Sequence, residues 1–271
     1  MTTPAGATDT HMHFYGPYAR WPLSPLSPNQ PAEASVAEYR LVQRRLGLER
    51  VVVVQPAGYR TDNRCTMAAV AEIGGTARAV VVVEPDAPEA ELMALRDGGA
   101  VGLRLFMLPG GIYRFAQIPD LAARTAGVGW HLQLQLDGRL LPEHEPLLTP
   151  LARAGRLVID HTGKFLEPVG ADHPAFRCLR RLVDAGAYVK LSAPYETSRT
   201  GPPAYADVAV LARALVAQAP ERMLWATNWP HPGHAPKDER ALLDWLGTLA
   251  PDEATRRRIL VDNPARFYGF G

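Results

Sequence analysis

Eight short apolar runs recur along the chain, and amphipathic segments separate them. The runs cover residues 7–14, 50–55, 78–84, 100–106, 128–136, 156–161, 187–192 and 222–228. Val51 to Val54 and Val80 to Val83 are apolar on both faces, as expected of strands with helices on one side and core on the other. The pattern therefore predicts parallel strands that helices connect.

The segments between the runs have helical periodicity, clearest at residues 33–46, 62–73, 87–97, 174–185 and 204–217. Gly74 and Gly98 each follow such a segment, where glycine commonly ends a helix. Eight strand-helix repeats in 271 residues predict one α/β domain over residues 1–271, a (β/α)8 TIM barrel. An open doubly wound sheet of the same elements is the alternative.

The overall charge favours no macromolecular partner. The 29 basic and 28 acidic side chains nearly cancel, so we expect no binding to nucleic acid or to an anionic membrane. Cys65 and Cys178 do not form a disulfide framework, and no export signal or membrane span is recognisable. We expect a cytoplasmic protein with a small-molecule substrate, and a homo-oligomer is possible on this evidence.

Polar residues end three of the runs, and the active site of such a barrel lies where its strands end. The first run ends in His11-Met12-His13, and strand alternation places both imidazoles on one face. The sixth ends in Asp160-His161, with Lys164 close behind. By alternation we expect Asp160 to face away from His161 and to have a structural role.

The eighth run adds Asn228 and His231 as polar tips. On the fourth run, Arg104 interrupts apolar residues and therefore needs an anionic partner or a water-filled mouth. A substrate carboxylate and an internal ion pair are equally good partners. The proline-rich segment 15–31 is predicted to be a loop above the site, and its Tyr15 either lines the pocket or packs against the barrel.

Taken in order, these motifs resemble the amidohydrolase-2 group of the amidohydrolase superfamily, and within it 2-pyrone-4,6-dicarboxylate hydrolase and related lactonases. The similar segments are Thr8 to His13, Val54 to Tyr59, Asp160 to Gly163, Thr227 to His231 and Asn263 to Gly269. The resemblance spans nearly the whole chain. It implies a TIM barrel and the hydrolysis of a cyclic ester without a metal ion.

The resemblance also implies the role of each residue. His11, His13 and His161 polarise the lactone carbonyl, and an aspartate at the end of the eighth strand activates water. Asn228 stands at that position, and an amide cannot accept a proton at neutral pH. The residues expected to contact the substrate are Arg104, Tyr59, Lys164, Tyr15 and Trp229.

The leading hypothesis is a metal-independent, lactonase-like hydrolase in which Asn228 positions water and His231 or another group takes the proton. A lyase, isomerase or cyclase with the same histidines as acid and base is the alternative, because the carboxylate is missing. A binding protein on a former enzyme scaffold is a third reading. We expect no cofactor, since His131 lies too early in its strand to join the site; one zinc ion at His11, His13 and His161 is the alternative.

Overall fold

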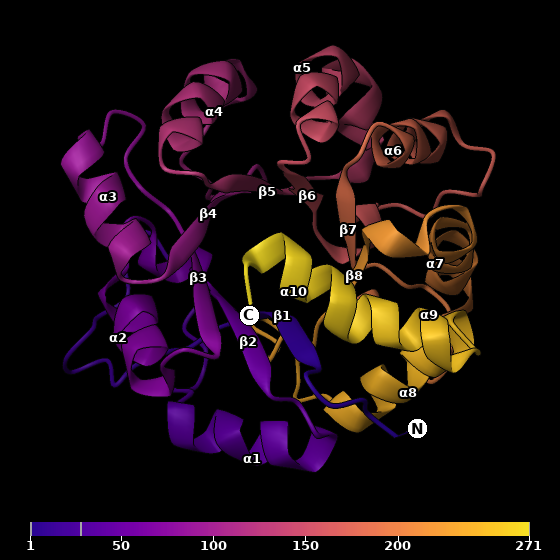
Figure 1. Ribbon diagram of the computed structural model, residues 1–271, viewed down its shortest axis with the longest axis horizontal. Coiled ribbons are helices and arrows are strands. Elements are labelled where there is room, and N and C mark those ends of the chain that lie inside the picture. Colours follow the sequence, from indigo (N-terminus) through magenta and orange to yellow (C-terminus); the bar gives the residue numbers. More distant parts are fainter. Residues whose placement is uncertain (1, 28, 271) are drawn as a thin grey trace.

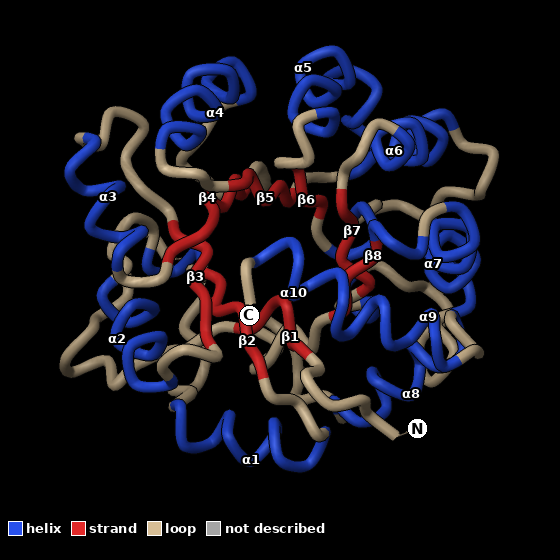
Figure 2. Tube along the Cα trace, in the orientation of Figure 1, coloured by secondary structure: helices blue, strands red, loops and turns tan. Residues whose placement is uncertain are grey.

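The computed structural model describes residues 2–27 and 29–270. In this part of the chain, eight strands form one parallel sheet in the order β1 to β8, and helices surround the ring of strands (Figures 1 and 2). The strands are β1 (Thr8–Met12), β2 (Arg50–Val54), β3 (Ala77–Val81), β4 (Ala100–Phe106), β5 (His131–Gln135), β6 (Leu157–Ile159), β7 (Tyr188–Leu191) and β8 (Met223–Trp225).

The helices follow the strands along the chain. They are α1 (Val36–Leu46), α2 (Arg64–Ile73), α3 (Glu89–Asp97), α4 (Ile118–Gly127), α5 (Leu141–Arg153), α6 (Pro174–Asp184), α7 (Ala206–Gln218), α8 (Glu239–Leu249), α9 (Glu253–Arg257) and α10 (Asn263–Tyr268). α2 and α3 end directly before Gly74 and Gly98, as the sequence predicts. None of the helices within the described ranges is long and apolar enough to cross a bilayer.

Hydrogen bonds from the segment after β8 close the ring onto β1. The backbone N–H of Asn228 donates to the carbonyl of His11 at 2.9 Å, and that of His13 donates to the carbonyl of Trp229 at 2.8 Å. Consecutive strand order together with this closure gives a (β/α)8 barrel, and the open doubly wound alternative is excluded.

The core has two layers because successive strand residues point to opposite faces. Val51 and Val53 belong to the large cluster between the strands and the helices. Val52 and Val54 belong to a smaller cluster inside the barrel, which Phe270 from the C-terminal segment also joins. Double-sided burial explains why these runs are apolar at every position.

The C-terminal segment covers the barrel end at which the strands begin (Figure 1). Asn263 donates from Nδ2 to the carbonyls of Pro220 and Met223, both at 2.8 Å, and so fixes α10 beneath β8. The ring of Phe267 lies 4.8 Å from that of His131, the first residue of β5. His131 is therefore at the bottom of the barrel, as expected, and the opposite end is left for the site.

Several strands end earlier than their sequence runs suggest, and at two of them this affects the polar residues. β6 stops at Ile159 and β8 at Trp225, so Asp160, His161 and Asn228 lie beyond regular strand. His161 and Asn228 have left-handed backbone conformations, with φ of 54° and 60°. Alternation along a strand therefore does not predict where these side chains point.

Replacing Asn263 by alanine tests the anchoring of α10. Two carbonyl groups then lose their donor, so we expect the free energy of unfolding to fall by about 1–3 kcal/mol in a urea titration followed by circular dichroism. Arg257→Ala is the control, because this side chain is exposed and its change should stay within about 0.5 kcal/mol. Equal effects of both substitutions would contradict the anchoring role.

Candidate active site

A cavity of about 180 Å³ opens where the strands end. Tyr15 from the loop after β1 forms part of its wall, one of the two placements that the sequence left open. The polar side chains that line it and carry the argument below are His13, Arg104, His161, Lys164, Glu196 and Asn228. This is the end of the barrel opposite to α10.

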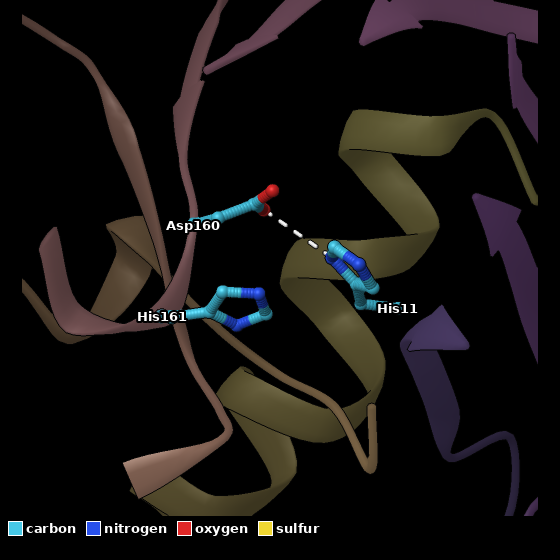
Figure 3. Close-up of side chains that lie close together, drawn as sticks. All are labelled: His11, Asp160 and His161. Atoms are coloured by element: carbon cyan, nitrogen blue, oxygen red, sulfur yellow. Dashed lines mark ion pairs between the residues drawn. The ribbon is translucent and has the colours of Figure 1, made fainter. Parts of the chain in front are cut away.

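The structure brings together three imidazoles from two distant stretches of chain. The ring centroid of His11 lies 4.9 Å from that of His13 and 4.9 Å from that of His161. His13 and His161 reach the cavity, whereas His11 is completely buried beneath its floor. Figure 3 shows His161 and Asp160 approaching His11 from the segment that follows β6.

Asp160 lies inside the barrel, which corrects the expectation that it faces away from His161. One of its oxygens is 3.3 Å from His11 Nδ1, and the other accepts a hydrogen bond from Gln133 Nε2 at 3.0 Å. The expectation failed because β6 ends at Ile159 and the left-handed turn at His161 brings both side chains inward. Asp160 therefore belongs to a group of buried polar side chains beneath the cavity, which we call the charged floor: Asp160, Lys190 and Gln133.

Lys190 of β7 supplies the positive charge of this floor. Its Nζ donates to the Thr10 carbonyl at 2.7 Å and to Gln133 Oε1 at 2.6 Å. It also lies 3.7 Å from Asp160 Oδ1, with both side chains fully buried. Burial lowers the pKa of Lys190 to about 8, and the charge of Asp160 opposes this shift.

The three histidines are neutral at physiological pH because they lie in a buried and positively charged environment. Burial is the main cause that lowers the pKa of each ring, and it takes that of His13 to about 3. Lys190 depresses the pKa of His11 further, and Arg104 that of His13. Each ring therefore offers one N–H donor and one lone pair.

The hydrogen bonds of His13 fix which nitrogen carries the proton. Its Nδ1 lies 2.7 Å from the carbonyl oxygen of Val54, which can only accept, so Nδ1 is the protonated nitrogen. Its Nε2 then presents a lone pair and not an N–H. The resemblance implies that His13 polarises a carbonyl, but this neutral tautomer cannot donate from Nε2.

His161 is free of this restriction. Its Nδ1 lies 2.8 Å from the hydroxyl of Ser192, which can either donate or accept. When Ser192 donates, Nε2 of His161 carries the proton and can donate to a ligand oxygen. Of the two cavity-lining imidazoles, His161 is therefore the one suited to stabilise an oxyanion.

Arg104 brings an unbalanced positive charge to the cavity. Its guanidinium donates to the Gln55 carbonyl at 2.7 Å and to Gln135 Oε1 at 2.5 Å, and its buried Nε has no partner. Within the described residues, no carboxylate forms an ion pair with it. The internal ion pair, one of the two readings of the sequence, is thus absent there, and a ligand oxygen or water is left as the partner.

Asn228 is held by the turn after β7. Its Nδ2 donates to the Tyr195 hydroxyl at 2.9 Å and to Glu196 Oε1 at 3.1 Å. The other oxygen of Glu196 forms an ion pair with Lys164. Both amide hydrogens of Asn228 are used in this way, so only its Oδ1 is available to a ligand, as a hydrogen-bond acceptor.

Three residues expected to act at the site lie behind its walls instead. His231 is buried, with Nδ1 2.8 Å from the Tyr195 hydroxyl and Nε2 3.2 Å from Glu239. It therefore orients Tyr195. Its hydrogen-bonding capacity is spent on these neighbours, which corrects the expectation that it takes a proton from the reactants.

Tyr59 and Trp229 were expected to contact the substrate, and neither lines the cavity. The Tyr59 hydroxyl accepts from the Gly16 backbone at 2.7 Å, and its ring stacks on Tyr15 at 6.0 Å. The ring of Trp229 lies 5.4 Å from that of Tyr39 in α1 and 6.1 Å from that of Phe14. These two aromatic side chains pack against other rings and therefore do not line the cavity.

Three buried side chains could together hold a metal ion, but an ammonium group lies beside them. His11, Asp160 and His161 each offer a ligand atom, all within 4.8 Å of one another, so Asp160 replaces the His13 of the expected set. However, Lys190 Nζ lies 3.5 Å from His11 Nδ1 and 3.7 Å from Asp160 Oδ1. A dication on these atoms would meet an ammonium group at close range.

Sequence reasoning missed Lys190 and Glu196. Lys190 interrupts the apolar run 187–192 as Arg104 interrupts the fourth run, and this signal was available in the sequence. Glu196 lies in the turn after β7, with no strand pattern to place it. Only the folded chain brings it next to Lys164 and Asn228.

Comparison with known proteins identifies the family of the chain. The family model described as Amidohydrolase matches residues 8–270. The chain belongs to the amidohydrolase family. It is therefore an enzyme of this family, as the motifs at the strand ends predict.

Relatives of this amidohydrolase cover almost all of the chain. A D-galactarolactone isomerase of Agrobacterium fabrum is 38% identical, over 98% of this chain and 91% of its own. A 2-pyrone-4,6-dicarboxylate hydrolase of Comamonas testosteroni is 35% identical, over 98% and 90%. A crystal structure of an apo protein from Agrobacterium tumefaciens has a TM-score of 0.91 and 36% identity, over 100% and 98%.

The tautomer of His13 can be observed directly. Because burial holds its pKa near 3, we expect its ring to remain neutral, with Nδ1 protonated, from pH 5 to 8. Long-range ¹H–¹⁵N NMR spectra distinguish the two tautomers and the imidazolium, and a His13→Gln variant assigns the signal. Exposed His173 supplies a reference ring in the same spectra. An imidazolium signal from His13 at pH 7 would contradict the assignment.

Proposed function

We propose that this amidohydrolase acts on a lactone and isomerises it by intramolecular acyl transfer, without a metal ion. In such a reaction a hydroxyl group of the substrate attacks the lactone carbonyl, and the original ring oxygen leaves. Water is not consumed. The names of the relatives, an isomerase and a hydrolase of lactones, support the lactone as substrate class.

The observation that carries this proposal is the neutral amide of Asn228 at the position for which the family resemblance implies a water-activating aspartate. Its amide hydrogens donate to Tyr195 and Glu196, so only Oδ1 can face a nucleophile. This oxygen can orient a hydroxyl group, but it cannot remove its proton at neutral pH. Water activation in the manner of the hydrolases is therefore absent at this position.

A tethered hydroxyl needs less activation than water. Well-oriented intramolecular nucleophiles reach effective molarities of about 10⁵–10⁸ M, because the entropy of bringing the reactants together has already been lost. A site without the aspartate therefore favours a substrate hydroxyl over water. The substrate class that this implies is a hydroxylated lactone whose free hydroxyl reaches the ring carbonyl.

The charges of the site suit the transition state of acyl transfer, in which the carbonyl oxygen becomes negative. The buried cations are Arg104, Lys164 and Lys190. Asp160 lies beside Lys190 and Glu196 forms an ion pair with Lys164, whereas no carboxylate within the described residues forms an ion pair with Arg104. The cavity-lining donors of Arg104, Lys164 and His161 are the candidates to hold the oxyanion.

Isotope labelling separates isomerisation from hydrolysis. With D-galactarolactone as probe in ¹⁸O-labelled water, we expect the wild-type enzyme to form an isomeric lactone without label. Mass spectrometry and ¹³C NMR of the products make the measurement. A labelled open-chain acid as the main product, from this probe or from 2-pyrone-4,6-dicarboxylate, would show a hydrolase and reject the proposal.

Asn228→Asp restores a carboxylate at the position of the amide. We expect this variant to gain hydrolysis of the probe, with ¹⁸O uptake, because the new carboxylate can accept a proton from water. Tyr195→Phe serves as a control. It removes the same hydrogen bond between residues 195 and 228 that Asn228→Asp disturbs, but it adds no base. A variant Asn228→Asp that isomerises as before and takes up no label would contradict this account of the amide.

Metal independence has its own test. Since Lys190 lies beside the atoms that would bind a dication, we expect dialysis against a strong chelator to leave the rate unchanged and elemental analysis to find metal far below one ion per chain. Added zinc should not raise the rate. Loss of activity on chelation with recovery on adding metal would overturn this part of the proposal.

A further inference from the structure

Glu196 is a carboxylate in the cavity wall to which neither the resemblance nor the comparisons assign a role. It lies in the turn after β7, and its side chain is 9% exposed. It lines the cavity together with Lys164 and Asn228 and contacts both of them. A largely covered carboxylate next to the amide that stands where the resemblance implies an aspartate calls for a chemical explanation.

The proposed acyl transfer needs a group that holds one proton for a short time. The attacking hydroxyl loses a proton, and the departing ring oxygen gains one. Asn228 cannot accept it, and the ammonium of Lys164 has no lone pair while it is charged. The lone pair of His13 faces the cavity, but burial and Arg104 lower the pKa of this ring to about 3, so its protonated form is strongly disfavoured.

Glu196 has the free acceptor sites that this step requires. An ionised carboxylate offers about four lone-pair positions. Lys164 takes one on Oε2 and the Nδ2 group of Asn228 takes one on Oε1. The positions left over are available to a substrate hydroxyl. The two contacts also hold the carboxylate at a fixed place beside the amide group of Asn228.

We propose that Glu196 is a catalytic residue, the proton acceptor and donor of the acyl transfer, and this rests on the proposed function. The substrate hydroxyl bonds to the carbonyl carbon and gives its proton to Glu196. The bond from this carbon to the ring oxygen then breaks, and Glu196 returns the proton to that oxygen. The two substrate oxygens are attached to the same carbon, so one carboxyl group can serve both. No electrons are transferred, and no water is consumed.

The chain contains a matched control for this ion pair. Glu167 and Arg199 belong to the same two loops as Lys164 and Glu196, and they form an ion pair at 3.2 Å. Both of these side chains are more than half exposed and do not line the cavity. Glu167→Gln removes a carboxylate that links the loops without removing one from the site.

The first measurement compares Glu196→Gln with Glu167→Gln, using D-galactarolactone as the probe. We expect kcat to fall by about 10²- to 10⁴-fold in Glu196→Gln, because general acid-base catalysis typically contributes this much. Glu167→Gln should retain the wild-type rate. Thermal unfolding of both variants shows whether they fold. A folded Glu196→Gln with wild-type kcat overturns the inference.

A second variant separates a catalytic role from a structural one. Glu196→Ala leaves space for a small carboxylate, so added formate should restore turnover in proportion to its concentration, whereas chloride should not. A structural defect would not respond to formate. Failure of formate to restore turnover in a folded Glu196→Ala protein counts against the carboxylate as the proton acceptor.

Failure of the two proposals is distinguishable. Uptake of ¹⁸O by the wild type overturns isomerisation. If kcat nevertheless falls in Glu196→Gln, Glu196 is the proton acceptor of a hydrolysis, with water in place of the substrate hydroxyl. Unlabelled isomer formed at an equal rate by wild type and Glu196→Gln supports isomerisation and overturns the role of Glu196.

Discussion

A buried ammonium and a buried carboxylate face each other across the barrel interior, and the rest of the site depends on them. Lys190 and Asp160 lie 3.7 Å apart with both side chains fully buried. Neither charge is stable at this depth without compensation, so Gln133 contacts both and Thr10 contributes its carbonyl. His11 lies beside this pair, and burial, followed by the charge of Lys190, lowers the pKa of its ring. The ammonium group of Lys190 lies close to His11 and Asp160, two of the three side chains that could bind a metal ion.

Above the charged floor, the side chains that line the cavity have different hydrogen-bonding roles, and one cannot take the role of another. The resemblance treats the histidines as one set that polarises a carbonyl, whereas the hydrogen bonds distinguish them. His13 presents a lone pair at Nε2 because its protonated Nδ1 donates to the Val54 carbonyl, and His161 can present an N–H because Ser192 can donate to its Nδ1. Asn228 orients without accepting a proton. A site of this kind suits a substrate that brings its own nucleophile.

The rim is held in place by strained backbone and by buried partners. His161, Asn228 and His231 all adopt left-handed φ values that residues with side chains rarely take, and such conformations persist only where the surroundings enforce them. Behind Asn228, the Tyr195 hydroxyl, His231 and Glu239 form a hydrogen-bonded chain from the site to the start of α8. His231 thus positions the amide although it does not reach the cavity.

The sequence by itself predicted eight strands and their connecting helices, because both follow from local periodicity, and it predicted which strand ends carry His11, His13 and His161. Closure into a barrel instead of an open sheet was decided by the tertiary structure. The tertiary structure alone decided the direction of Asp160 and the place of Glu196. Asp160 follows β6, which ends early, and Glu196 lies in the turn after β7; no periodicity encodes the dihedral angles of these segments. Periodicity in the sequence describes only residues that are close together in the chain. The site is a set of contacts between residues far apart in the chain, which exist only once the barrel has closed.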